Sequence, residues 1–509
     1  IKSSAASDVY KRQLLNIMAS NTPYLVREQP PKALIYLLLV AGLVAITYAI
    51  IAQKLLIAVA IVCLPIVILA VAYGFQNPYF VYLLYATYAF FFTTISRYTL
   101  KVKLSVGLDI ILVYLSVSLL VVFYLKKTNF RLKDAVNIFT LSYIAWIIFI
   151  LLQLANPHIN EEGITHGIRI MILETFVLYI IASIISNSPK VLRNGLILIG
   201  LFTIIAFLKL MYQRYVGFDS SERYWLYVQE AAKTHILSTG IRYFSYFTDA
   251  GNFGTVMGAI ATVYTIIGFN TRNRKFAIFY LSIAAMGIIG MLFSGTRGAL
   301  VVPFAGLALY CLICKSIRTF AITIITGLCI FAFLAFTDIG NGNSFIRRAR
   351  TAFRPTADAS FNVRIQNRKE MALYLKDYPF GIGIANSIPK LWLKQDLTYE
   401  EGTLPPDSYF VSIWIQTGIV GLVLNITIYL VTLLGCCYIV MFKVKDRYLR
   451  HQLAAFTCTV FGILLSGYTG YAPGMPPTNF IIVAMIAFVM NGAYIDKQIT
   501  QQKLTINKQ

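Results

Sequence analysis

The chain has 509 residues, of which 58% are hydrophobic and 13% charged, and its mean hydropathy is +0.70. Soluble proteins carry about 25% charged residues, so this composition excludes a chain of ordinary soluble domains. Because one membrane crossing takes about 20 apolar residues, fourteen crossings would use about 280 residues. This is about 55% of the chain, close to its hydrophobic fraction of 58%. The composition therefore predicts a polytopic membrane protein, on which a net charge of +23 does not by itself indicate nucleic-acid binding.

The N-terminal segment 1–31 precedes the first apolar run and is expected to be cytoplasmic. Residues 1–17 begin without Met and contain neither a signal-peptide core nor a helical period. We expect the stretch IKSSAASDVYKRQ to be foreign to the native protein, with Met18 as the native start. The first span itself would act as the insertion signal.

Apolar runs predict eleven membrane helices within residues 32–337 and three more within 408–495. The run 408–441 is long for one crossing, so it is expected to tilt or to start as an interfacial helix. The expected fold is an all-α bundle of about 12–14 transmembrane helices with one large helical loop at 338–407. The runs lie at about 33–52, 55–73, 79–96, 104–125, 135–155, 170–186, 195–212, 252–269, 276–293, 299–314, 319–337, 408–441, 453–468 and 479–495.

The short loops on the two membrane sides differ in positive charge. With the N-terminus inside, six cytoplasmic loops hold 15 Lys and Arg in 43 residues, whereas five loops on the other side hold 6 in 38 residues. The positive-inside rule thus favours an even number of spans, with the N-terminus and the tail 496–509 in the cytoplasm. Only the loop 97–103, with Arg97, Lys101 and Lys103, opposes this orientation.

This orientation places two long segments, 213–251 and 338–407, outside the membrane. In a helix, Arg347, Arg350 and Arg354 of the second segment would share one face. Such a face is typical of a solvated helix on anionic head groups, but guanidinium groups can also grip the oxygens of a diphosphate bidentately. The arginines of the second segment are Arg347, Arg348, Arg350, Arg354, Arg364 and Arg368.

Arg297 lies in the motif SGTRGAL at 294–300, in a five-residue break between two apolar runs. An arginine so close to the hydrocarbon either snorkels to the interface or has a specific partner. A helix that starts near Gly298 would point free N–H groups at an anion, so this motif predicts a phosphate site.

Arg242 lies in a similar setting, in the stretch IRYFSYFTDAGNFGT at 241–255, which leads into the apolar run 252–269. Asp249 and Asn252 make the entry to that run polar. Both are ordinary helix-capping residues as well as candidates for a site.

Four motifs, in their order along the chain, resemble those of the bacterial O-antigen ligases and the related O-antigen polymerases. The resemblance covers roughly residues 195–440. The motifs are IRYFSYFTDAGNFG, SGTRGAL, VRIQNRKEMALYLKDYPFGIGIANS at 363–387 and PDSYFVSIWIQTGIVG at 406–421.

The resemblance implies metal-independent glycosyl transfer, without a cofactor, on the periplasmic face of the bacterial inner membrane. The donor would be an undecaprenyl-diphosphate-linked glycan, and the acceptor a hydroxyl of a glycan or lipid. By motif match, Arg242 and Arg297 would hold the diphosphate during catalysis, with Arg364 nearby. Asn252 and Tyr409 stand at motif positions that would contact substrate.

The chain departs from the family where the large loop ends, because Pro406-Asp407 replaces the usual His-Asn. In the ligases that histidine is the proposed base, so its absence favours a polymerase or another transferase. Asp407 is the candidate general base here, since a carboxylate at a membrane interface can have a raised pKa. Helix capping together with Ser408 is its structural alternative.

Two other functions remain open from the residues alone. A polysaccharide or lipid transporter would have a similar number of spans, although no internal repeat is evident and the Arg-rich loop exceeds what a transporter requires. A peptidoglycan-type glycan polymerase would also rely on acidic and arginine residues in outer loops. A polyprenyl-phosphate-sugar enzyme is disfavoured, because only Gln53 and Lys54 separate the first two runs.

Overall fold

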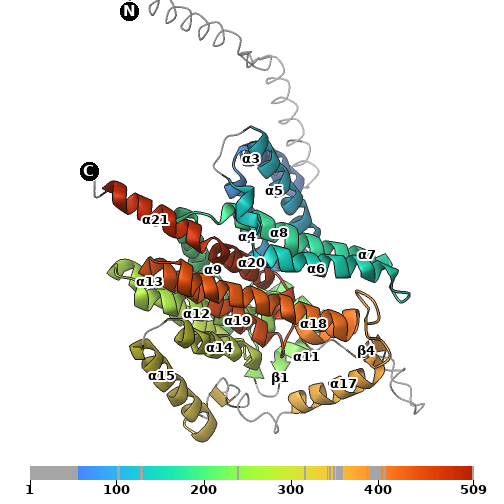
Figure 1. Ribbon diagram of the computed structural model, residues 1–509. Helices are drawn as coiled ribbons and strands as arrows, with labels where there is room; N and C mark the ends of the chain where they lie inside the picture. Colours follow the sequence, from blue (N-terminus) through green and yellow to red (C-terminus); the bar gives the residue numbers. More distant parts are fainter. Residues whose placement is uncertain are drawn as a thin grey trace, which may run out of the picture. The chain divides into compact units, whose positions relative to one another are not determined.

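The computed structural model (Figure 1) describes most of the chain. The chain forms two units, 1–73 and 74–509, of which the second holds nearly all the described elements. The described residues are overwhelmingly helical, which confirms the all-α class. They are 47, 55–99, 104–125, 130–159, 161–237, 240–314, 317–340, 342, 346–347, 350, 359–386, 388–389, 403–404 and 408–506.

The helices before the first long segment are α3 Leu55–Gln76, α4 Pro78–Thr99, α5 Val106–Tyr124, η1 Leu132–Ala135, α6 Ile138–Leu152, η2 Gln153–Ala155, α7 Glu161–His166, η3 Gly167–Val177, α8 Leu178–Ile185 and α9 Pro189–Tyr215. The first long segment contains α10 Ser220–Arg223, η4 Tyr224–Val228, α11 Ala232–His235, β1 Ile236–Leu237 and β2 Gly240–Ile241.

The following helices are α12 Ala250–Asn270, α13 Arg274–Phe293, α14 Arg297–Ile313, α15 Ile317–Phe336 and α17 Ala359–Leu375. After β3 Ile388–Pro389 and β4 Thr403–Leu404 come α18 Tyr409–Tyr438, η7 Ile439–Lys443, α19 Arg447–Ser466, η8 Ala472–Gly474, α20 Thr478–Met490 and α21 Gly492–Ile506. Two antiparallel pairs form the only strands of the described residues, β1 with β2 and β3 with β4.

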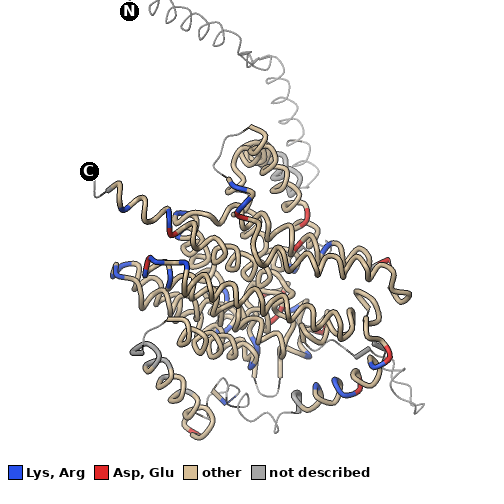
Figure 2. The backbone as a smooth tube through the Cα atoms, in the orientation of Figure 1, with Lys and Arg blue, Asp and Glu red and all other residues tan. Residues whose placement is uncertain are grey.

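Nine helices of the described residues are long and apolar enough to cross a membrane, and a tenth span is possible if the bent pair α20 and α21 counts as one. Three shorter apolar helices accompany them, at Leu64–Gln76, Arg297–Ile313 and Gly327–Phe336. The chain is therefore a multi-pass membrane protein. Figure 2 shows Lys and Arg gathered near helix ends and on α17, with long stretches of the spans free of charge.

The last expected span, 479–495, contains a bend between two helices. α20 ends at Met490, and α21 leaves it at an angle of 56°. The side chain of Asn491 at the break donates hydrogen bonds to the carbonyl oxygens of Ser183 (2.6 Å) and Ser186 (3.0 Å). These bonds tie the helix end to α8, and the chain continues from Gly492 in a new direction.

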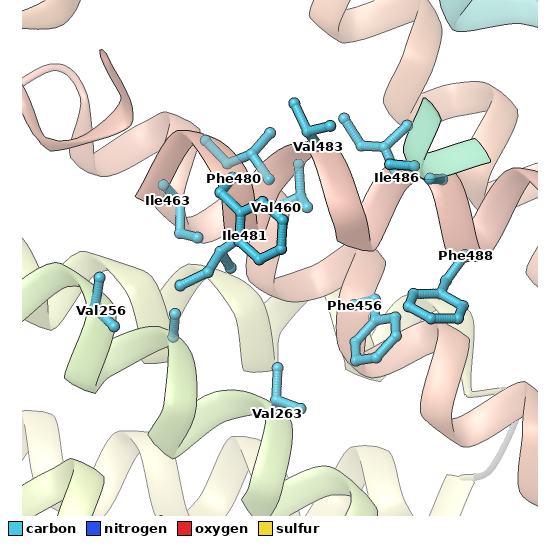
Figure 3. Packing of buried hydrophobic residues seen from close by; sticks show 14 of the residues in the cluster. Val256, Val263, Phe456, Val460, Ile463, Phe480, Ile481, Val483, Ile486 and Phe488 are labelled. Carbon is cyan, nitrogen blue, oxygen red and sulfur yellow. The ribbon is translucent and has the colours of Figure 1, made fainter. Parts of the chain in front are cut away.

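The centre of the bundle is α12, which is buried along most of its length and packs against α13, α14 and α19. Figure 3 shows how α12, α19 and α20 interdigitate through apolar side chains, among them Val256, Phe456 and Ile481. Since a membrane offers little hydrophobic driving force between helices, close packing must supply much of the stability here. The other labelled members are Val263, Val460, Ile463, Phe480, Val483, Ile486 and Phe488.

Two glycines allow the central helices to approach backbone to backbone. A Cβ at Gly462 of α19 would lie 2.3 Å from the carbonyl oxygen of Val302 in α14. A Cβ at Gly287 of α13 would lie 2.8 Å from the backbone nitrogen of Ala261 in α12. Small residues at these crossings are what close helix packing in membranes requires.

The turn that follows α17 docks against a break in α18. Gly418 interrupts α18 with a φ of 68° and a ψ of −173°, and Gly381 of the turn has a φ of 80°. The Ile382 N–H donates to the carbonyl oxygen of Ile415 (3.0 Å), and the Val420 N–H donates to that of Pro379 (3.3 Å). These bonds fix α17 relative to the start of α18.

Candidate functional site

The first element of the site is the start of α14, which begins at Arg297, one residue before the expected start. Thr296 precedes it but does not cap the helix with its side chain. Its hydroxyl instead donates to the carbonyl oxygen of Ala250 (2.9 Å) at the start of α12. This hydrogen bond fixes the start of α14. The positive end of the α14 dipole therefore lies at Arg297, where the sequence predicts an anion site.

Arg242 follows β2 and joins that strand pair to the start of α14. Its Nη1 donates to the carbonyl oxygen of Thr234 (2.9 Å), and its Nη2 donates to the hydroxyl oxygen of Thr296 (2.9 Å). A guanidinium has five N–H donors, so the described contacts use two of them. Arg242 therefore holds these two segments together and still has N–H donors for a further partner.

The electrostatics of Arg242 show which groups surround it. Burial lowers the pKa of its guanidinium, Asp249 opposes this change, and the positive charges of Arg297 and Arg364 lower the pKa further. Arg297 of α14 and Arg364 of α17 are thus close enough to Arg242, which follows β2, for their charges to repel it. We call Arg242, Arg297 and Arg364 the arginine cluster.

α17 reaches this cluster through the turn that follows α19, residues 467–470. Arg364 Nη1 donates to the carbonyl oxygen of Thr469 (3.0 Å). One helical turn later, Arg368 Nη2 donates to the carbonyl oxygen of Tyr468 (2.7 Å), and its guanidinium lies 4.2 Å from the centre of that tyrosine ring. On the other side of the turn, a Cβ at Gly298 would lie 2.0 Å from the hydroxyl oxygen of Thr469.

The segment that carries Arg242 rests on polar groups from distant helices. Arg97 of α4 is buried and donates to the carbonyl oxygen of Phe247 (2.9 Å). Its guanidinium carbon lies 4.3 Å from the centre of the Trp225 ring. Gln213 of α9 accepts from the Ser245 N–H (3.0 Å). Sequence reasoning missed this role of Arg97, for which local sequence offers only an arginine on the unexpected side of the membrane.

A lysine and two carboxylates fasten the start of the same segment. Lys209 of α9 contacts Asp219 (2.9 Å) and Glu222 (3.0 Å). Asp219 is partly buried, which would raise its pKa, but hydrogen bonds from Lys209 and Tyr98 lower that pKa to about 2. Asp219 is therefore ionised at neutral pH and holds α10 against α9.

His235 is a second support that the sequence did not single out. Its buried ring accepts a hydrogen bond at Nε2 from the Ala250 N–H (3.2 Å), so Nδ1 carries the proton and donates to the carbonyl oxygen of Ala231 (2.9 Å). Its own carbonyl accepts from the Arg242 N–H (2.8 Å). The neutral ring thus joins the Arg242 segment to the start of α12.

Asp249 and Asn252 both bind within the protein. Asp249 caps α12 by accepting from the N–H groups of Gly251 (2.5 Å) and Asn252 (2.9 Å). The buried side chain of Asn252 donates to the carbonyl oxygen of Pro476 (2.7 Å) and accepts from the Thr478 hydroxyl (2.6 Å). These bonds connect the start of α12 with that of α20.

Tyr409 begins α18 directly after Ser408, whose side chain caps the helix by accepting from the Val411 N–H (3.3 Å). The Tyr409 N–H donates to the carbonyl oxygens of Gly467 and Gly470, each at 3.1 Å. The start of α18 therefore contacts the same turn that receives Arg364 and Arg368.

Two other arginines of the large loop, Arg347 and Arg350, are among the described residues. Arg350 is buried and donates to the carbonyl oxygen of Ile339 (2.5 Å) and to the Thr337 hydroxyl (3.2 Å), just after α15. Arg347 is exposed. Arg354 and Asp407, the predicted base, lie outside the described residues.

Within the described ranges, no three His, Cys, Asp or Glu side chains gather as a metal ion would require. Metal independence itself stays a prediction.

These features define a polytopic helical membrane protein in which arginines from three separate segments meet at one end of the bundle. Residues 280–426 match the O-antigen ligase family model, so this segment is similar to the family that the sequence motifs resemble. The match includes Arg297, Arg364 and Asp407, whereas Arg242 and Asn252 precede it. No curated protein matches the chain. The family supports an enzyme of lipid-linked glycan ligation or polymerisation.

Proposed function

We propose that the protein transfers a glycan from an undecaprenyl-diphosphate carrier to an acceptor hydroxyl on the periplasmic face of the bacterial inner membrane, without a metal ion. The observation that carries this proposal is the arginine cluster, in which the positive charges of Arg297 and Arg364 act on Arg242. Cations are costly to gather in a partly buried place unless an anion is to be bound there. A diphosphate is the anion that the family match makes relevant.

The chemistry requires stabilisation of a leaving diphosphate. The acceptor oxygen would attack the anomeric carbon while the bond from that carbon to the phosphate oxygen breaks, and the bonding electron pair would leave with the diphosphate. Arginines and the positive end of α14 would stabilise the charge that develops on it. This role needs guanidinium groups at fixed positions, and the bonds of Arg242 to Thr234 and Thr296 supply one such position.

The proton of the acceptor hydroxyl needs a base, and we assign that role to Asp407. Its neighbours Ser408 and Tyr409 support the assignment, because Tyr409 is bonded to the turn that also receives Arg364. In a reconstituted assay, Asp407→Asn should lower the transfer rate at least about 100-fold, the usual scale of general-base catalysis. Full activity of this variant would return Asp407 to a capping role beside Ser408.

We assign the remaining predicted residues to the surroundings of the cluster. The bonds of Asn252 and Tyr409 suit residues that hold the substrate-facing segments in place. Arg347 and Arg354 would contact the glycan beyond the diphosphate. Arg350, which is bonded to the end of α15, would hold that part of the loop in position.

The transporter alternative gains little from the breaks in the helices. A transporter is expected to break helices near the bilayer midplane. Gly418 interrupts α18 nine residues after its start at Tyr409, in the first third of the 30-residue helix. The bend at Asn491 follows the last residue of α20 and lies at a helix end.

The deciding experiment incubates the purified full-length protein with an undecaprenyl-diphosphate oligosaccharide, with and without a lipid A core acceptor. We expect either a lengthened glycan, which identifies a polymerase, or transfer to the core, which identifies a ligase. A lipid II substrate in a parallel reaction distinguishes the peptidoglycan-type alternative. Transport of the intact lipid-linked glycan across a vesicle membrane without any transfer would overturn the proposal in favour of a flippase.

A further inference from the structure

A large cavity lies at the opposite end of the central helices from the arginine cluster. Its volume is about 1170 Å³, and it is formed by the start of α9, the connection between α12 and α13, the start of α19 and the middle of α21. α12 runs from the cluster to this cavity over 21 residues, which corresponds to about 30 Å at 1.5 Å per residue. That separation is close to the thickness of the bilayer hydrocarbon core.

The lining of the cavity is strongly cationic. It contains six Lys and Arg side chains and a single carboxylate, that of Asp446. Asp446 is already paired with Lys503 at 2.7 Å. In the part of the chain that the structure describes, none of the five lining cations other than Lys503 makes an ion pair. The six cations are Lys190, Arg193, Arg272, Lys445, Arg447 and Lys503.

Topology alone does not account for this arrangement. The positive-inside rule explains why basic residues are enriched at one membrane face, but it does not require them to surround a common cavity. Exposed cations at the same end, Arg274, Lys275 and Lys497, lie outside the lining and provide a direct comparison. The lining cations come from four separate parts of the chain, so only the fold brings them together.

An apolar crevice adjoins the cavity. It lies between α4, α9, α12 and α20, its lining exposes apolar surface only, and Leu192 of α9 borders both spaces. A Cβ at Gly195, one turn further along α9, would meet no atom within 4 Å, so the crevice has room at this point. A cationic cavity beside an apolar crevice fits a molecule with an anionic head and a hydrocarbon chain.

We propose that the cavity binds the phosphate head group of an anionic phospholipid, with part of an acyl chain in the adjoining crevice. Several arginines and lysines around one phosphate provide charge-assisted hydrogen bonds, and the crevice removes apolar surface of the lipid from water. The site is separate from the arginine cluster, so binding here does not depend on the proposed transfer reaction.

Native mass spectrometry of the purified full-length protein in a neutral detergent tests the proposal with three probes, phosphatidylglycerol, phosphatidylcholine and inorganic phosphate. We expect phosphatidylglycerol to bind at least tenfold more tightly than phosphatidylcholine. The triple variant Arg193→Gln, Arg272→Gln and Arg447→Gln should weaken phosphatidylglycerol binding by about 100-fold, since each cation near a membrane surface contributes about a factor of five to ten. Gly195→Leu should weaken it several-fold by filling the crevice.

The matched control removes the same charge outside the cavity, with Arg274→Gln, Lys275→Gln and Lys497→Gln in one chain. This control should bind phosphatidylglycerol within about twofold of the parent protein, and all variants should retain its thermal unfolding midpoint. Equal losses in the two triple variants would reduce the effect to general surface charge and overturn the proposal. Tight binding of inorganic phosphate, unaffected by Gly195→Leu, would identify a soluble phosphate ligand and overturn the lipid assignment.

Discussion

Two N–H donors of Arg242 bind groups of the protein itself, so these contacts fix the position of its charge. Its terminal nitrogens reach the Thr234 carbonyl and the Thr296 hydroxyl, which belong to different segments. A lysine has one terminal nitrogen and presents no planar fork, so it keeps the charge but cannot make both contacts in this geometry. Substitution by lysine therefore separates charge from geometry.

We predict that Arg242→Lys and Arg297→Lys each lower the rate of glycan transfer by about 10- to 100-fold, because a lysine cannot hold a diphosphate with two parallel hydrogen bonds. The corresponding alanine variants should abolish chain extension while the protein is still inserted and expressed. Arg274→Lys, at the other end of the bundle, is the control and should retain the parent rate. Normal glycan length in the cells that carry Arg242→Ala and Arg297→Ala would contradict the role of the cluster.

His235 makes the stability of the Arg242 segment depend on pH. Burial lowers the pKa of its ring below the ordinary 6.5, and the nearby charges of Arg242 and Arg97 act in the same direction, against the Ala231 carbonyl and Asp249. The unfolded state then binds more protons than the folded state. The contribution of His235 is therefore complete above about pH 6.5 and is lost as the pH falls below it.

We predict that the thermal unfolding midpoint in detergent falls between pH 7 and pH 5.5, with His235 contributing at most about 1.4 kcal/mol per pH unit. His235→Gln should flatten this dependence, whereas His158→Gln, at an exposed position, should leave it unchanged. An identical slope in His235→Gln and the parent would show that other groups cause the dependence.

At the residue scale, the sequence predicted the members of the cluster better than their supports. Arg242, Arg297 and Arg364 stand in local motifs that can be recognised along the chain. Arg97 and His235 act through contacts with residues that their local sequences do not reveal, such as Phe247 and Ala250. Such long-range contacts arise only when the helices pack, so no local pattern could have identified them.

At the scale of elements, the close approach of the α14 and α19 backbones can be tested by substitution. Any side chain at Gly462 would meet the backbone of Val302, which cannot move aside as a flexible side chain can. We predict that Gly462→Ala lowers the free energy of unfolding by about 1–3 kcal/mol, the usual cost of overpacking.

The matched control is Gly195→Ala in α9, where the added methyl group meets nothing within 4 Å. This change should be neutral or should stabilise the helix by up to about 1 kcal/mol, because alanine has the higher helix propensity. Thermal unfolding in detergent measures both variants. Equal shifts in the two would show that the crossing is looser than the structure has it.

Hydropathy predicted most of the helices but not their ends. The run expected at 170–186 belongs to a continuous helical stretch that starts at Glu161, because Arg169 pairs with Asp109 of α5 at 2.7 Å and its charge is thereby accommodated. The bend after α20 was missed because the apolar run continues past it, while the cause is the bonding of Asn491 to α8. In both cases a partner from another helix decides where an element begins or ends.

For the molecule as a whole, the two ends of the bundle differ in function under our proposals, one for transfer and the other for lipid binding. The orientation can be tested by cysteine labelling in a background without native cysteines. In spheroplasts, a membrane-impermeant maleimide should label Lys376→Cys, just after α17, but should label Lys275→Cys only after lysis. Labelling of both positions before lysis would refute the expected topology.

The contact between Gly381 and Gly418 constrains how this sequence can change. A Cβ at Gly381 would lie 2.5 Å from the backbone of Gln416, and a Cβ at Gly418 would lie 2.0 Å from the carbonyl oxygen of Pro379. Both glycines also have positive φ angles, which other residues adopt only with strain. The two positions are 37 residues apart yet exclude side chains for the same reason. Wherever relatives keep this docked turn, we expect glycine to be inherited at both positions together, and a relative that has lost one should have lost the other.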